Sequence, residues 1–177
     1  MITKNPTSGL APMACAVFLR WLFIVISMVA LVGCASHPSV VRHGFAFDFI
    51  DDSPDAELLD YRYGDSRNPA ARNSMEERNR GKSRQQSDTA GEMLRGDELY
   101  VKWRLKATGE KYEDTVDLRS RLPADIEGCR VYFLVRGPQL YVYLITPQKR
   151  DKNEPRNGPS KWSSYRTVTL YPGQPKF

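Results

Sequence analysis

Four aspartates fall within one short stretch of the chain. Asp48, Asp51, Asp52 and Asp55 follow the spacing D-x-x-D-D-x-x-D. Closely spaced carboxylate oxygens are the ligands that Ca²⁺ prefers, so a calcium site is one chemistry that this stretch could support. The spacing lacks the glycine and the terminal glutamate of an EF-hand loop, and Pro54 lies among the aspartates. Aspartates beside a proline are typical of turns. The sequence therefore favours a polar turn and predicts no metal site.

Histidine and cysteine offer few catalytic arrangements. His37 and His43 have no carboxylate or thiol at a useful spacing, so we interpret both as solvated linker residues. Cys129 begins an apolar stretch and is expected to pack as a small hydrophobic side chain, with an intermolecular disulfide as the alternative. The chain contains no G-x-S-x-G, no zinc-type spacing and no phosphate-binding glycine loop. We expect a protein that is not an enzyme and holds no cofactor; a hydrolase that uses an unrecognised carboxylate pair stays open.

The N-terminus carries the strongest signal. Lys4 and Arg20 are the only charged residues before an unbroken apolar run over residues 21–32, which Gly33 and Cys34 follow. A basic flank, a short apolar segment and a small residue at its end are typical of a secretory signal. Twelve helical residues reach about 18 Å, which is too short for a hydrocarbon core of about 30 Å. A cleaved signal peptide is therefore favoured over a permanent membrane helix.

The sequence Leu31-Val32-Gly33-Cys34 resembles the lipobox of bacterial lipoprotein precursors. The resemblance implies that residues 1–33 are a signal peptide and that Cys34 carries covalent lipid after cleavage. It also implies an anchor in the cell envelope. Because Ala35 and not aspartate follows the cysteine, the resemblance implies the outer membrane, with the protein facing the periplasm. The expected partners are therefore membrane lipid, through Cys34, and an unidentified protein.

Two basic stretches could meet an anionic partner. The candidate contact residues are Arg78, Arg80, Lys82 and Arg84 in the first stretch, and Lys149, Arg150 and Lys152 in the second. Phosphates of lipid headgroups or an acidic protein would suit them. The alternative, which we favour, is that charge keeps two loops soluble. Nucleic acid is not expected, because an exported protein rarely meets it.

The rest of the chain alternates with the period of two that is typical of strands. A tether over residues 34–42 leads into one β-rich domain over residues 43–177. Residues 64–96 contain no aromatic residue, valine or isoleucine, so we expect a mobile or disordered insertion with at most a short helix near residues 70–80. Strand signals fall at 45–50, 59–63, 99–105, 112–118, 129–135, 140–145 and 164–171. The expected fold is all-β: a small antiparallel β-sandwich or barrel-like domain of about seven strands, with α+β as the alternative.

Aromatic residues recur on these expected strands. They are Trp103, Tyr132, Tyr141, Tyr143 and, just before the last strand, Trp162. They could form an exposed recognition face, but aromatics that alternate along strands more often pack in a core or against a neighbouring strand, and we expect packing here.

Three segments resemble small β-rich lipoproteins of Gram-negative bacteria. They are the run at 99–103, the stretch from 116 to 123 and the paired runs at 131–133 and 140–142. Some relatives in that group are associated with type VI secretion loci, where lipoproteins can act as immunity proteins against an incoming toxin. The resemblance implies a non-enzymatic, membrane-anchored binding module. An envelope-stabilising or assembly lipoprotein that contacts anionic lipid through its basic loops is the alternative.

Overall fold

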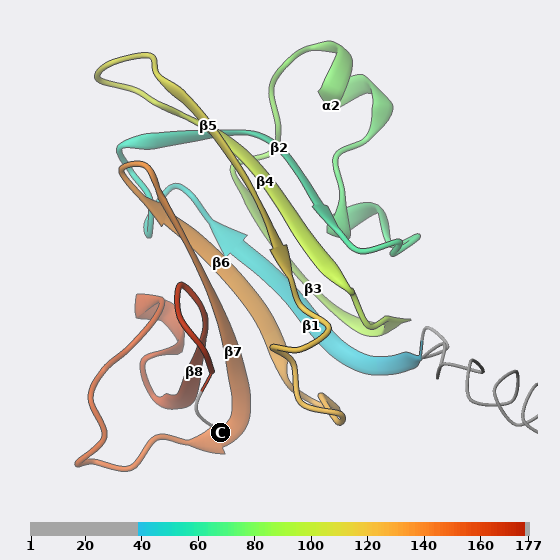
Figure 1. Ribbon diagram of the computed structural model, residues 1–177, viewed down its shortest axis with the longest axis vertical. Helices are drawn as coiled ribbons and strands as arrows, with labels where there is room; N and C mark the ends of the chain where they lie inside the picture. The colour runs from blue at the N-terminus through green and yellow to red at the C-terminus, as the bar shows by residue number, and fades with distance from the viewer. Residues whose placement is uncertain (1–38, 176–177) are drawn as a thin grey trace, which may run out of the picture. The chain divides into compact units, whose positions relative to one another are not determined.

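A computed structural model describes residues 39–175 of the chain (Figure 1). The expected signal peptide, the Leu31–Cys34 motif and His37 lie outside the described residues. The first strand begins at Val40. It therefore includes three residues that we assigned to the tether.

The described residues contain eight strands in two sheets. The five-stranded sheet has the order β3 (Gln86–Leu94), β1 (Val40–Asp48), β6 (Arg130–Arg136), β7 (Gln139–Lys149) and β8 (Tyr165–Tyr171). The three-stranded sheet has the order β2 (Ala56–Tyr63), β4 (Glu98–Leu105) and β5 (Lys111–Asp117). Three short helical segments complete the inventory: η1 (Pro69–Ala71), α2 (Met75–Asn79) and η2 (Ser160–Trp162). The all-β class is confirmed. Over residues 39–175, no helix has the length and apolar character needed to cross a membrane.

Pairing is antiparallel everywhere except between β1 and β6, which run parallel. The expected hairpin of residues 99–105 and 112–118 is confirmed as β4 and β5. The β6 and β7 strands form a second hairpin around Gly137 and Pro138. Gly137 has a φ of +56°, the left-handed conformation that glycine supplies at the first position of a two-residue hairpin turn.

One apolar core fills the space between the sheets. Its centre is an aromatic cluster from β1, β2 and β6, in which Phe45 stacks on Tyr63 with ring centroids 4.9 Å apart and Phe47 contacts Phe133 at 4.9 Å. In Figure 1 the smaller sheet overlies β1, β3 and β6. The β6 strand lies between β1 and β7 and is buried along nearly its whole length. This agrees with its almost continuous apolar sequence, which is typical of strands covered on both faces.

The interpretation of residues 64–96 as an insertion without regular structure is wrong. Residues 86–94 form β3, the edge strand that pairs with all nine residues of β1. The segment before it contains η1 and α2, and α2 is the short helix that the sequence allowed near residues 70–80. The β3 strand was missed because its exposed face and most of its inner face are polar, and Met93 is its only buried residue.

Candidate functional site

Residues 68–85 cover the free edge of β2, and we call them the edge cap. The side-chain amide of Gln85 bonds both backbone groups of Leu58: Oε1 accepts from the Leu58 N–H at 2.9 Å, and Nε2 donates to the Leu58 carbonyl at 2.9 Å. Farther along β2, the Asn73 backbone N–H donates to the Tyr61 carbonyl and the Asn73 side chain donates to the Leu59 carbonyl. Two amide side chains thus replace a neighbouring strand, a common way to protect a sheet edge.

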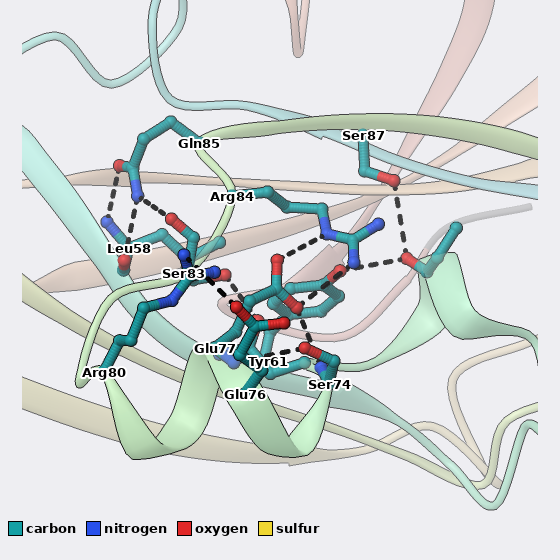
Figure 2. Close-up of polar contacts among 12 residues, drawn as sticks. Leu58, Tyr61, Ser74, Glu76, Glu77, Arg80, Ser83, Arg84, Gln85 and Ser87 are labelled. Carbon is teal, nitrogen blue, oxygen red and sulfur yellow. Dashed lines mark hydrogen bonds and ion pairs between the residues drawn. The ribbon is translucent and has the colours of Figure 1, made fainter.

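An ion pair closes the edge cap on itself. Figure 2 shows the Glu77 carboxylate facing the Arg84 guanidinium, whose Nε and Nη2 donate to its two oxygens at 3.1 Å each. The Glu77 carboxylate also accepts from the Ser74 backbone N–H at 2.8 Å. In return, the Ser74 hydroxyl oxygen accepts from the Glu77 backbone N–H, and this pair of bonds caps α2. Burial raises the pKa of Glu77, but these hydrogen bonds outweigh burial and lower the pKa to about 2. The carboxylate is therefore a structural anion and is not poised for proton transfer.

In the first basic stretch, some residues form ion pairs within the fold and the others are exposed to solvent. Arg84 is held by Glu77, and Arg80 lies 3.7 Å from Glu76 in an exposed pair along α2. Arg78 and Lys82 are exposed and form no ion pair within the described part of the chain. Two of the four candidate contact residues, Arg78 and Lys82, are therefore free to meet an anion.

The second basic stretch is divided in the same way. Arg150 donates to the backbone carbonyls of Ser163, Asp151 and Glu154, and this binds the two ends of the β7–β8 loop together. Lys149 places its Nζ 3.9 Å from the centre of the Tyr165 ring, a cation–π contact. Lys152 is exposed. Arg150 is therefore a structural residue, and Lys152 is the member of the three that is open to a partner.

The aspartate stretch forms the turn that the sequence favoured. Asp48 Oδ1 accepts from the backbone N–H groups of Ile50 and Asp51, and Asp48 Oδ2 accepts from Gln86. Asp52 accepts from the Tyr132 hydroxyl at 2.7 Å and from the Ser160 backbone N–H at 3.2 Å. Among residues 39–175, no three acidic, histidine or cysteine side chains are placed to hold a metal ion.

Most of the aromatic residues pack as expected. Trp103 is buried in the core and its Nε1 donates to the Gly137 carbonyl at 3.0 Å. Tyr132 and Tyr143 belong to a smaller apolar cluster on the outer face of the larger sheet, against which Tyr141 and Trp162 pack. The Arg130 guanidinium covers the Trp162 ring at 4.6 Å from its centroid. This cluster attaches the β7–β8 loop to the sheet. Cys129 likewise packs against the core, half-buried, and burial raises its thiol pKa.

The interpretation of His43 as a solvated linker residue is wrong. His43 lies on β1 with only 2% of its surface exposed. Its Nδ1 is 2.8 Å from the Val41 carbonyl and its Nε2 is 3.0 Å from the Tyr63 hydroxyl. Because a carbonyl can only accept, Nδ1 carries the proton and Nε2 accepts from Tyr63. Burial lowers the pKa of His43, and the hydrogen bond to Val41 and the charge of Glu127 oppose that shift only in part.

An open cavity of about 500 Å³ is lined by residues next to Gly64 and Arg95, and we call it the tether-end cavity. Its walls come from the residues after β2, the β3–β4 turn and the end of β5. Arg95 in that turn donates its backbone N–H to the Ser39 carbonyl at 2.9 Å, which places the cavity at the end of the sandwich where the described chain begins. None of its lining residues was identified from the sequence as a candidate site residue.

Two glycines shape this cavity. A Cβ on Gly96 would lie 2.5 Å from the Tyr63 ring, and one on Gly64 would lie 2.7 Å from the Gly96 Cα. The β3–β4 turn can therefore approach the end of β2 only because both positions lack a side chain. Glycines next to charged residues, in Gly64-Asp65 and Arg95-Gly96-Asp97, were the available sequence signal for this site.

Three comparisons with known proteins gave no match. No protein-family model, no curated protein and no solved structure matches this chain.

Proposed function

We propose that this chain is a bacterial lipoprotein anchored in the cell envelope through acylated Cys34, at the outer membrane and facing the periplasm. Its β-sandwich acts as a non-enzymatic module that binds another protein. The observation that carries the proposal is the apolar run that ends in Leu31-Val32-Gly33-Cys34, with a folded β domain that begins six residues later at Val40.

The short tether limits where the domain can work. Five residue steps separate Cys34 from Ser39, and an extended chain covers at most about 18 Å over that length. A lipid on Cys34 would therefore hold the sandwich within a few nanometres of the bilayer. Two or three acyl chains would make that attachment nearly permanent, because each buried methylene contributes about 0.8 kcal/mol.

A binding role fits the chemistry of the folded part better than catalysis. Three partly buried charged residues form contacts that fix loops to the sandwich: Glu77 pairs with Arg84, and Arg150 donates to backbone carbonyls of the β7–β8 loop. By resemblance to small β-rich lipoproteins, an immunity or accessory lipoprotein of a secretion system is the specific role we propose. The alternative role, contact with anionic lipid through the basic loops, is favoured by the exposed cations Arg78, Lys82 and Lys152.

Membrane fractionation tests the anchor, and crosslinking in intact cells tests the partner. The Cys34→Ser variant should stay an uncleaved precursor, and Cys129→Ser is the matched control that keeps the motif. Crosslinking should give a discrete protein adduct with the native chain. Identical processing and membrane attachment of the Cys34→Ser variant would contradict the anchor, and the absence of any adduct at wild-type abundance would contradict the binding role.

A further inference from the structure

We propose that the tether-end cavity binds a small zwitterion in which an ammonium and a phosphate lie a few bonds apart, as in the headgroup of an ethanolamine phospholipid. The inference rests on the proposed lipid anchor, because that anchor would bring the cavity close to the membrane. It goes beyond the proposed function in assigning a ligand class to residues that have no role in the fold's core.

The charged residues of the cavity favour a ligand that carries both a positive and a negative charge. Two of its cation–anion pairs are already satisfied: Arg119 with Asp117, and Arg62 with the lining residue Glu98. In contrast, Arg95, Asp65 and Asp97 line the same cavity and form no ion pair within residues 39–175. One cation and two carboxylates are thus left for a ligand. A ligand with only negative charge would face the carboxylates, and a simple amine would leave the guanidinium without an anion.

The Arg95 guanidinium is the cation that the phosphate of the ligand would meet. Its Nη2 donates to the Leu122 carbonyl at 3.1 Å, and its Nε is buried and has no hydrogen-bond partner among the described residues. Because Nε is closed to solvent, a phosphate oxygen of the ligand would accept instead from Nη1, which forms no hydrogen bond within the described residues. Such a charge-assisted hydrogen bond is of the kind that guanidinium groups form well with phosphates.

The carboxylates offer the complementary half of the site. Asp65 and Asp97 are exposed and line the cavity, on the two segments that Gly64 and Gly96 bring together. Primary ammonium groups donate up to three hydrogen bonds, so one such group could serve both carboxylates. A cavity of about 500 Å³ is within the range of small-molecule sites and is larger than a phosphoethanolamine group needs.

The position of the cavity favours a ligand from the membrane. Arg95 is hydrogen-bonded to Ser39, which is five residues after Cys34. Whatever conformation the intervening residues adopt, an acylated Cys34 could lie no more than about 18 Å along the chain from that contact. A headgroup at the bilayer surface is therefore the nearest abundant source of a phosphate joined to an ammonium.

Titration of the full chain, purified in a non-ionic detergent, with O-phosphoethanolamine tests the site directly. Calorimetry should show saturable binding, with weaker binding of inorganic phosphate or ethanolamine alone. Arg95→Gln and Asp97→Asn should each weaken binding about tenfold or more, the effect expected for loss of one charge-assisted hydrogen bond. Arg104→Gln is the matched control, because Arg104 pairs with Glu57 and does not line the cavity.

Vesicles distinguish the two sources of the ligand. Phosphatidylethanolamine in vesicles should compete with free O-phosphoethanolamine, whereas phosphatidylcholine, whose methylated ammonium cannot donate hydrogen bonds, should not. Saturable binding without competition by either lipid would retain the site and assign it a soluble ligand. No binding up to about 10 mM, or equal affinity of the wild-type, Arg95→Gln and Asp97→Asn chains, would overturn the site.

The same sample separates this inference from the proposed function. Mass spectrometry shows whether Cys34 is acylated before the titration begins. An acylated chain that does not bind overturns the cavity inference alone. An unacylated native chain overturns the lipoprotein proposal, whatever the outcome of the titration. Asp97 is exposed, so its variant should fold even if the Arg95 variant does not.

Discussion

The Glu77 carboxylate accepts two hydrogen bonds of 3.1 Å from the Arg84 guanidinium, and this pair closes the loop that protects the edge of β2. The Glu77 side chain is 11% exposed, against 79% for its neighbour Glu76. The two glutamates therefore differ sharply in environment although they are adjacent in the sequence. Substitution of the exposed Glu76 is therefore a matched control for substitution of Glu77.

Replacing Glu77 by glutamine should destabilise the edge cap by about 2 kcal/mol, because Arg84 loses its ionic partner. Glu76→Gln should change stability by less than about 0.5 kcal/mol. Hydrogen exchange of the Leu58 amide, whose N–H is bonded to Gln85, measures the opening of the cap. Equal exchange rates in the two variants would show that the ion pair does not hold the cap.

Acid should open the same segment. Glu77 has a pKa of about 2 when folded, below its ordinary value of 4.5. Its contribution is therefore complete above pH 4.5 and is lost as the pH falls from 4.5 towards 2. In the Glu77→Gln variant this part of the acid sensitivity should disappear. An unchanged pH profile between these limits would contradict the assignment.

Because His43 is buried, we expect the free energy of unfolding to depend on pH a second time, at milder acidity than for Glu77. Its folded pKa lies below the ordinary 6.5, so the unfolded chain takes up a proton first. Stability should be constant above about pH 7 and should fall as the pH drops below 6.5, by at most about 1.4 kcal/mol per pH unit. His43→Gln should flatten the slope, and His37→Gln, which changes the chain's other histidine, should retain it. Denaturant unfolding at several pH values checks both.

We expect the aspartate turn to stabilise the fold through hydrogen bonds and not to bind calcium. Asp52→Ala removes the acceptor of both the Tyr132 hydroxyl and the Ser160 amide, and should cost about 1–2 kcal/mol. Asp51→Ala should be nearly neutral, because Asp51 contributes its backbone N–H to the turn. Addition of Ca²⁺ should leave the melting temperature of the wild-type chain unchanged. A calcium-dependent rise of several degrees would show that the turn is a metal site.

The close approach of Gly96 to Tyr63 can be tested by adding one methyl group. Gly96→Ala should cost about 1–3 kcal/mol, because the new Cβ would lie 2.5 Å from the Tyr63 ring. Gly109 has a φ of +75° but open space around it, so Gly109→Ala should cost only about 1 kcal/mol of backbone strain. Thermal unfolding of both variants measures the difference. A Gly96→Ala variant as stable as the wild type would contradict the described packing.

The strands of the core could be predicted from the sequence because their side chains alternate between an apolar interior and a polar surface. The same rule could have placed His43, which precedes Phe45 and Phe47 at intervals of two and shares their inward face. It failed there because a histidine before the first aromatic residue resembles a linker. The β3 strand gave no signal, since Ser87 and Thr89 face the polar edge cap instead of an apolar sheet.

The candidate sites were predictable only in part. The aspartate turn and the packed aromatic residues follow from local sequence, and both were expected. The pairing of Arg84 with Glu77 depends on the path of a loop, and Arg150 binds carbonyls that no pattern of residues reveals. The tether-end cavity joins residues from three separate segments around Asp65, Arg95 and Asp117, so it exists only once the sheets are assembled.

The mass of the native chain is the sharpest test of the lipid anchor. If Cys34 is acylated, the purified protein begins at Cys34, lacks residues 1–33 and carries fatty acid at its N-terminal cysteine. Digestion should then yield a hydrophobic N-terminal peptide that contains Cys34 and Ala35 with the added acyl mass. A chain that still begins with methionine and carries no fatty acid would contradict the lipid anchor and the role proposed from it.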